Sequence, residues 1–323
     1  MKRIIAVLLA LCLCAMLFAC GKTEGEDVTV RVVALKGPTG MGMVQLMSKD
    51  ADGTAANDYE FTLASSPEEA QAAIANVDIA ALPVNLAAAL YNKGEDISFA
   101  AINTLGVLSI LENGNTIESI ADLKGKTIYA TGQGSTPEYI LNYLLEKNGI
   151  DPETDVTIEY LTEHTELATK LASGDAAIGL LPEPNVTVAL TSAAANGNTD
   201  LRIALDATEE WSKLGEGELV QGCIVVSNKF KTEHPEQYEA FLEEYKASVE
   251  YVNTDIEAAA ADIAEFGIVP KAEVAKKAIP NCNICCYDGK EGTDYMKAML
   301  TVLYEANPKS VGGKMPDDAF YGE

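Results

Sequence analysis

Two stretches of the chain, residues 68–83 and 164–182, carry the same order of features. Each predicts a helix with small apolar residues, then a turn, then an apolar strand that begins with an Asp and ends at a Pro. The segments around each stretch continue this alternation of strand and helix. Alternating β and α units form a mostly parallel sheet with helices on both faces, so the repeat predicts an α/β protein with two lobes built on one plan.

Strands are predicted where Val-rich and Ile-rich runs alternate, and helices where apolar residues recur with helical spacing. Strands are expected at residues 28–35, 59–64, 78–82, 97–102, 126–130, 155–160, 175–181, 200–205 and 219–227. The last third of the chain is helical in character, with helices expected at residues 235–252, 255–265, 271–279 and 293–306. This helical part is expected to pack back on the first lobe.

That arrangement makes the chain cross between the lobes twice, near residues 104–108 and 215–222. It assigns residues 28–104 and 222–323 to lobe 1 and residues 105–221 to lobe 2. Two crossovers form a hinge, and closure of a hinge around a ligand is a known use of such a layout.

The N-terminus has the pattern of an export signal. Two basic residues precede an apolar run over residues 4–19, and Cys20 follows it directly. Residues 17–20 resemble a bacterial lipobox, which predicts a signal peptide over residues 1–19, a lipid anchor such as palmitate on Cys20 and a polar tether over 20–27. An ordinary secretory signal or an uncleaved anchor is the alternative, although the run is short for a membrane span.

The charge balance excludes some classes of partner. The chain has 49 acidic and 23 basic residues, a formal net charge of -26. A nucleic-acid-binding protein needs a basic patch, and a protein that docks on anionic lipid by charge needs one too. We therefore expect no nucleic-acid partner, and membrane attachment only through the lipid.

The state of four cysteines stays open at this level, because buried thiols, a disulfide and a metal site all fit the spacing. These are Cys223, Cys282, Cys285 and Cys286. A metal site would need further ligands, and the two histidines, His164 and His234, are distant in sequence.

Ligands of open parallel sheets bind beyond the carboxyl ends of the strands. Four segments follow predicted strands in this way, two in each lobe: residues 36–43, 83–85, 131–138 and 182–185. Their glycines permit close backbone approach, and their hydroxyls stand at predicted helix starts beside free N–H groups. A simple strand-to-helix turn is the alternative for either glycine loop alone. The candidate ligand-binding residues are Pro38, Thr39, Gly40, Met41, Gly42, Pro83, Asn85, Gly132, Gln133, Gly134, Ser135, Thr136, Glu183 and Trp211.

Catalytic patterns are sparse, so neither a catalytic residue nor a metal or other cofactor is expected. Neither glycine loop ends in the Gly-Lys-Ser/Thr of a phosphate-binding loop, and the second also lacks the dinucleotide pattern. Arg31 and Arg202 are the two arginines beyond residue 19. Tight anion sites usually recruit arginine, so this scarcity disfavours a doubly charged anion. Trp211 is the one Trp, in a polar segment that reads as a loop, and could contact a planar ring.

Several motifs occur together and resemble those of a known family. They are the lipobox and residues 35–42 (LKGPTGMG), 122–127 (DLKGKT), 130–138 (ATGQGSTPE), 180–184 (LLPEP) and 312–321 (GGKMPDDAFY). Together they resemble ABC-transporter substrate-binding lipoproteins of the nitrate/sulfonate/taurine and thiamine-precursor group. The resemblance covers the whole chain.

The resemblance implies a two-lobed periplasmic-binding-protein-like fold of type II, the type with two crossovers. It implies capture of a small organic solute between the lobes and delivery to an ABC permease with a cytoplasmic ATPase. The protein would be a lipid-anchored, extracytoplasmic monomer. The family's binding loops match residues 37–42, 83–85 and 132–136 and Glu183, whereas the scarcity of arginine departs from its sulfonate and nitrate binders.

Two other functions remain as alternatives. An enzyme on the same fold could act on a cofactor precursor, but it would need a positioned base or metal between the lobes. A sensory lipoprotein could instead report solute occupancy to a receptor kinase. The low histidine content and the predicted lipid anchor count against the enzyme.

Overall fold

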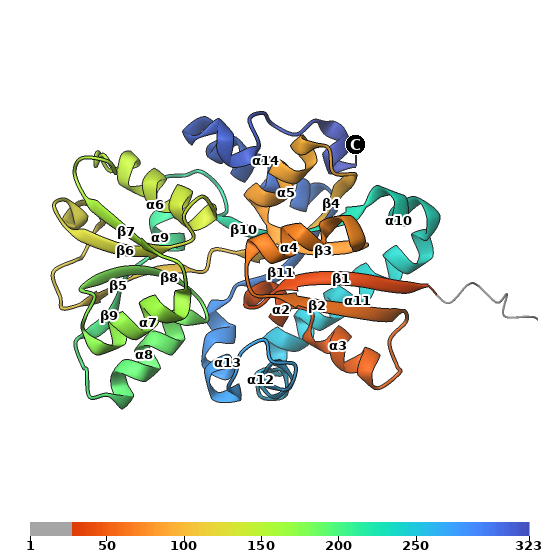
Figure 1. Cartoon of the computed structure of the whole chain (residues 1–323), viewed down its shortest axis with the longest axis horizontal. Helices are drawn as coiled ribbons and strands as arrows, with labels where there is room; N and C mark the ends of the chain where they lie inside the picture. The colour runs from red at the N-terminus through yellow and green to blue at the C-terminus, as the bar shows by residue number, and fades with distance from the viewer. Residues whose placement is uncertain (1–27, 323) are drawn as a thin grey trace, which may run out of the picture.

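The strands pair into two separate sheets in the computed structural model, which describes residues 28–322 (Figure 1). The predicted signal peptide 1–19, lipid site Cys20 and tether 20–27 lie outside these residues. Each sheet is flanked by helices on both faces, and this confirms the predicted two-lobed α/β fold (Figure 1).

The sheet of lobe 1 has the strand order β11-β4-β10-β3-β1-β2. Its members are β1 (Thr29–Leu35), β2 (Asp58–Ala64), β3 (Ile79–Pro83), β4 (Ile97–Leu105), β10 (Val220–Ser227) and β11 (Ile284–Asp288). β10 runs antiparallel to both of its neighbours, β3 and β4, so the strands β1 to β4 all point the same way. Central strands β3 and β4 are buried on both sides because helices cover both faces.

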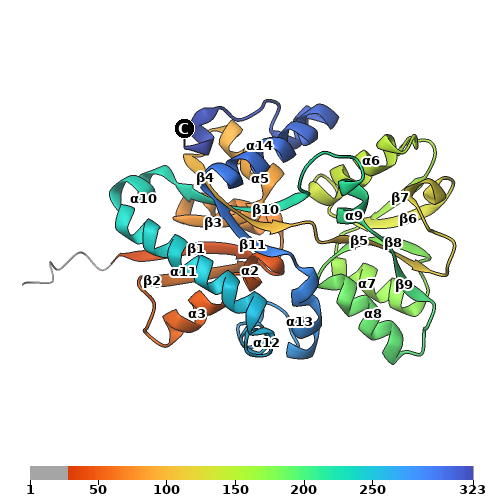
Figure 2. The ribbon, with the colours of Figure 1, turned by 180° about the vertical axis from the view of Figure 1, so that it is seen from behind.

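Two layers of helices cover this sheet. One layer contains α4 (Pro67–Ala73), α5 (Val84–Lys93) and α14 (Gly289–Ala306). The other contains α3 (Val44–Ala51), α11 (Pro235–Thr254) and α12 (Ile256–Glu265) (Figure 2). The expected return of the helical C-terminal third to the first lobe is thus observed.

The sheet of lobe 2 has the strand order β7-β6-β8-β5-β9, and only β5 runs against the others. Its members are β5 (Leu108–Asn113), β6 (Thr127–Thr131), β7 (Thr157–Leu161), β8 (Ile178–Pro182) and β9 (Leu201–Asp206). Helices α6 (Thr136–Lys147) and α9 (Ala207–Ser212) cover one face, and α7 (His164–Ser173) and α8 (Asn185–Ala195) cover the other (Figure 1).

The chain crosses between the lobes at two places. Gly106 and Val107 join β4 to β5, and residues 213–219 join α9 to β10. Both lie where crossovers were predicted. The strands β5 and β11 were not predicted: the expected crossing was near residues 104–108, residues 109–113 were assigned to no element, and the segment of β11 was considered only as a cysteine motif. The segment around Trp211 is also not a loop: it is α9, whose first turn is capped by the carboxylate of Asp206.

The lobes touch on both sides of the hinge. On one side, a single hydrophobic cluster runs from α5 and α14 of lobe 1 into α6 of lobe 2. On the other side, α13 (Ala272–Ala278), which belongs to the C-terminal part, packs against α8 (Figure 2). None of the helices among residues 28–322 is long and apolar enough to cross a membrane.

Candidate functional site

The first predicted loop, which follows β1, is a short helix, α2 (Pro38–Met41), and most of it is buried. The Thr39 hydroxyl donates to the carbonyl oxygen of Leu35 at 2.8 Å, so its hydrogen bond is made within the turn that follows β1. Met41 belongs to the core of lobe 1. A Cβ on Gly40 would lie 2.8 Å from the Leu35 carbonyl oxygen, and one on Gly42 would lie 2.8 Å from the Tyr245 hydroxyl. These glycines are therefore required by packing within lobe 1.

The second loop of lobe 1 follows β3 and meets lobe 2 directly. Pro83 ends β3, and Asn85 lies in the first turn of α5, where it is 5% exposed. Its side-chain oxygen accepts a hydrogen bond from the hydroxyl of Thr136 at 2.7 Å. Thr136 opens α6 in lobe 2, so this bond joins two of the predicted loops across the space between the lobes.

The glycine loop of lobe 2, residues 132–135, has a different character from α2. Gly132 and Gly134 have φ values of 75° and 76°, in the left-handed region that favours glycine. Gln133 and Gly134 are exposed, and a Cβ on Gly134 would meet nothing within 4 Å. The Ser135 hydroxyl donates to the Gly132 carbonyl oxygen at 2.6 Å. The carboxylate of Glu138 accepts from the Gly134 N–H, which fixes the loop to α6.

Glu183 follows β8 and is buried, with 4% of its surface exposed. Its carboxylate accepts from the Thr187 N–H at 3.1 Å and from the Thr187 hydroxyl at 3.0 Å. Burial raises the pKa of this carboxyl, and the hydrogen bonds from Thr187 and Asn281 offset the effect only in part. Within residues 28–322, Glu183 forms no ion pair.

The segment that leads into β11 forms a further wall of this site, and the sequence analysis missed it. Asn281 hydrogen-bonds Glu183 from lobe 1. The Cys282 thiol lies 3.7 Å from the Met41 sulfur. Asn283 donates from Nδ2 to the Gly106 carbonyl oxygen at 2.5 Å, so it holds the first crossover. Its φ of 43° is in the left-handed region, which asparagine tolerates better than most residues.

All four predicted segments therefore lie where the two lobes meet. Gly37, at the start of the α2 loop, faces Pro184 of lobe 2, since a Cβ on it would lie 3.9 Å from the Pro184 ring. Together with the bond from Thr136 to Asn85, this contact brings the loops of the two lobes side by side. The prediction that Trp211 contacts a ligand is wrong, because its side chain is 1% exposed. Its ring packs against that of Tyr143 at a centroid distance of 5.1 Å.

The four cysteines are free thiols, and no cluster among residues 28–322 has the side chains to hold a metal. Burial raises the pKa of the Cys286 thiol to about 12 and raises those of Cys223, Cys282 and Cys285 as well. Because the thiolate is the reactive form, burial disfavours the reaction of these cysteines.

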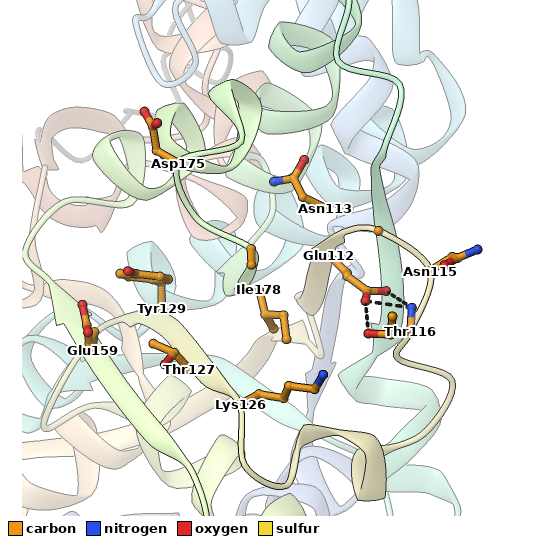
Figure 3. Close-up of a pocket in the computed structure, with 12 residues that line it drawn as sticks. Glu112, Asn113, Asn115, Thr116, Lys126, Thr127, Tyr129, Glu159, Asp175 and Ile178 are labelled. Carbon is orange, nitrogen blue, oxygen red and sulfur yellow. Dashed lines mark hydrogen bonds between the residues drawn. The ribbon is translucent and has the colours of Figure 1, made fainter.

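Two cavities lie outside the contact between the four predicted segments. One of about 450 Å³ opens at the amino ends of β6 and β8 in lobe 2, and its wall includes Glu112 and Lys126 (Figure 3). The Glu112 carboxylate is satisfied there, by Thr116 and by Arg202 at 2.8 Å. The other cavity, of about 700 Å³, lies between the outer side of α6 and the end of α14. Of the four predicted segments, only 131–138 contributes to its wall, through Glu138.

Two α/β lobes, two crossovers and polar loops that meet between the lobes define a periplasmic-binding-protein-like fold. The chain belongs to the NMT1/THI5-like family, whose model matches residues 76–259. No curated protein sequence matches the chain.

Three solved structures show the same fold over most of their length. An ABC transporter from Parabacteroides distasonis is 24% identical, with a TM-score of 0.77, over 92% of this chain and 99% of its own. The periplasmic aliphatic sulphonate binding protein SsuA from Escherichia coli is 16% identical, with a TM-score of 0.70, over 91% and 93%. The periplasmic nitrate-binding protein NrtA from Synechocystis is 11% identical, with a TM-score of 0.59, over 88% and 84%.

Proposed function

We propose that this protein is the extracytoplasmic solute-binding component of an ABC importer. The observation that carries the proposal is the Thr136–Asn85 hydrogen bond, which joins a loop of lobe 2 to a loop of lobe 1 beyond the carboxyl ends of their strands. That edge is where ligands bind in open α/β sheets. Structures of the same fold from Escherichia coli and Synechocystis are named as binding proteins for aliphatic sulphonate and nitrate, which supports the same role here.

The proposed site combines loops from both lobes with the wall that leads into β11. It comprises Thr39, Pro83 and Asn85 of lobe 1, residues 132–136 and Glu183 of lobe 2, and Asn281. We further propose the domain division 28–104 with 222–323 for lobe 1 and 105–221 for lobe 2.

Closure around the solute is the proposed mechanism. A solute that contacts both lobes binds the closed state more tightly than the open one, so it shifts the population toward closure. A permease with a cytoplasmic ATPase would then distinguish the loaded protein from the empty one. The protein would act as a monomer, held to the membrane by lipid on Cys20 after removal of residues 1–19.

Native mass spectrometry tests the proposal. The protein is purified gently from its own cells, and half of the sample is unfolded and refolded as the control. We expect a small molecule of defined mass on the first half, absent from the second, and a raised unfolding temperature in its presence. An unliganded mass in both halves, together with no stabilisation by a broad panel of solutes, would contradict the proposal. Membrane retention of a Cys20→Ser variant would contradict the lipid anchor alone.

A further inference from the structure

The end of β4 contains an irregularity at the edge of the proposed site. Cys223 of β10 pairs with Ile102, and the residue before it, Gly222, pairs with Thr104. Asn103 is thus an extra residue without a partner, which makes it a β-bulge. Bulges re-aim side chains and are frequent beside functional sites.

Both side chains at the bulge are buried with unpaired oxygens. Asn103 is 0% exposed; its Nδ2 donates a long hydrogen bond of 3.4 Å to the Cys223 carbonyl oxygen, but its Oδ1 has no partner among the described residues. Thr104 is 3% exposed, and its hydroxyl has no partner there either. A buried polar group without a hydrogen bond is costly, so each needs a physical reason.

Both side chains lie beside Gly222, because a Cβ placed on Gly222 would collide with Asn103 Oδ1 and lie 3.2 Å from the Thr104 hydroxyl. Gly222 pairs with Pro83 on its other side, which is two residues from Asn85. Gly222 therefore lacks a side chain because Asn103 and Thr104 occupy the space where its Cβ would stand, one strand away from Pro83.

Glu183 adds a third oxygen group to this region. Its backbone N–H donates to the Val107 carbonyl oxygen at 2.9 Å, three residues beyond Thr104. Ile284 of β11 pairs with Thr104, and Asn281 just before it hydrogen-bonds Glu183. The Asn103 oxygen can only accept hydrogen bonds, and so can the Glu183 carboxylate in its ionised form.

Neither arginine among residues 28–322 is free to bind an anion at the proposed site. Arg31 forms an ion pair with Asp78 at 2.8 Å, and Arg202 forms one with Glu112 at 2.8 Å. Lys36, beside the α2 loop, is exposed and forms no ion pair within residues 28–322. An oxyanion placed beside Glu183 would meet a buried negative charge.

We propose that Asn103 and Thr104 contact the solute, and that the solute is a neutral or cationic molecule rich in N–H donors, such as an amine, amidine or amino-heterocycle. This rests on the proposed function and deepens it. The unpaired oxygens of the bulge are then satisfied when the solute binds, and Glu183 gains the donor or positive charge that its burial lacks. The same site rejects oxyanions.

Matched variants on β4 test the role of the bulge. Thr104→Val and Asn103→Leu remove the unpaired oxygens with little change in shape. Ser98→Ala is the control, because Ser98 also has a buried hydroxyl without a partner among residues 28–322 but lies near the other end of the strand. Removal of an unsatisfied group is expected to leave the unfolding temperature of the ligand-free protein equal or higher in all three variants.

The probes are benzamidine, cytosine and putrescine as donor-rich compounds, with ethanesulfonate and nitrate as oxyanions. They are screened by thermal shift, and hits are measured by calorimetry. We expect a donor-rich probe to bind wild type and Ser98→Ala equally and to bind Thr104→Val and Asn103→Leu about tenfold more weakly, the effect of one lost hydrogen bond.

Other outcomes separate the two levels of the argument. Binding of ethanesulfonate or nitrate in preference to the donor-rich probes would overturn this inference and leave the proposed function intact. Equal binding of a donor-rich probe to wild type and Thr104→Val would remove the bulge from the site. If no probe binds and native mass spectrometry finds no small molecule, the proposed function fails and this inference fails with it.

Discussion

The two glycine loops that looked alike in sequence differ in why they contain glycine. In the loop of lobe 1, Gly40 and Gly42 are packed so tightly against Leu35 and Tyr245 that no side chain fits. In the loop of lobe 2, Gly132 and Gly134 have positive φ, and the space beside Gly134 is open. The first loop is therefore part of the core of lobe 1, and the second is an exposed loop that is free to contact a solute.

This difference changes what the pattern Gly-x-Gly means. A glycine can be required by its backbone angle or by a close neighbour, and the sequence pattern is the same in both cases. Only the packing of the folded chain separates them. The pattern thus correctly marked the ends of two strands, but it did not show that Gly134 alone of these four glycines has open space beside it.

The largest expected effect tests this comparison by placing leucine at one glycine of each loop. Gly40→Leu forces its Cβ to within 2.8 Å of the Leu35 carbonyl oxygen, a contact with backbone that cannot move aside cheaply. We expect it to lower the free energy of unfolding by about 3 kcal/mol or more. Gly134→Leu, at a φ of 76° but in open space, should cost only about 1–2 kcal/mol. Urea unfolding measures both.

Ligand binding provides the second readout for the same pair. A folded Gly134→Leu protein should bind the solute more weakly than wild type, because the new side chain occupies space beside the proposed site. Equal stability losses at the two positions would mean that the loops do not differ in packing as described. Undiminished affinity of Gly134→Leu would remove the second loop from the site.

A smaller effect is expected where the lobes meet. Thr136→Val keeps the shape of the side chain but deletes the hydroxyl that donates to Asn85 at 2.7 Å. A double-mutant cycle with Asn85→Ala should give a coupling energy of about 1 kcal/mol in unfolding experiments, because the two side chains are buried and bonded to each other. Additive effects of the two substitutions would show that the bond does not stabilise contact between the lobes.

The fold could be predicted from the sequence because its signals are local. Short apolar runs predict the strands that begin near residues 28, 59, 78 and 126. The alternation of these strands with helices predicts one helix-covered sheet in each lobe. The two missed strands have local reasons too. β5 is buried on nearly every residue and follows a crossover without a turn signal, and β11 is short and begins after an asparagine with positive φ.

The candidate site could be predicted only in part, because much of it depends on contacts between distant segments. Thr136 and Asn85 were candidates because they follow strands, but their mutual hydrogen bond spans 51 residues. Asn103 and Thr104 carry no motif, since a bulge depends on the register of β10. Trp211 was a candidate because its segment is polar, yet the capped helix α9 turns its ring into the core.

The smallest expected effect is a difference in pH dependence between two buried glutamates of lobe 2. Glu183 has no ion pair, and burial raises its pKa, so the folded state binds its proton more tightly than the unfolded state does. The penalty for its charge should therefore shrink as the pH falls from neutral toward its ordinary value of 4.5. We expect the stability advantage of Glu183→Gln over wild type to decrease over that range.

Glu112 provides the control of opposite sign. It is buried as well, but hydrogen bonds from Thr116, Ile117 and Arg202 outweigh burial and lower its pKa, so its contribution to stability is present above the unfolded value and is lost as the pH falls. Wild type should therefore exceed Glu112→Gln in stability at neutral pH and lose this excess in acid. Urea unfolding of the three proteins at several pH values measures both slopes. If Glu183 showed the slope expected of Glu112, hydrogen bonds or a positive group in the ligand-free protein would already stabilise its charge, and the preference of the site for donor-rich solutes would lose its electrostatic basis.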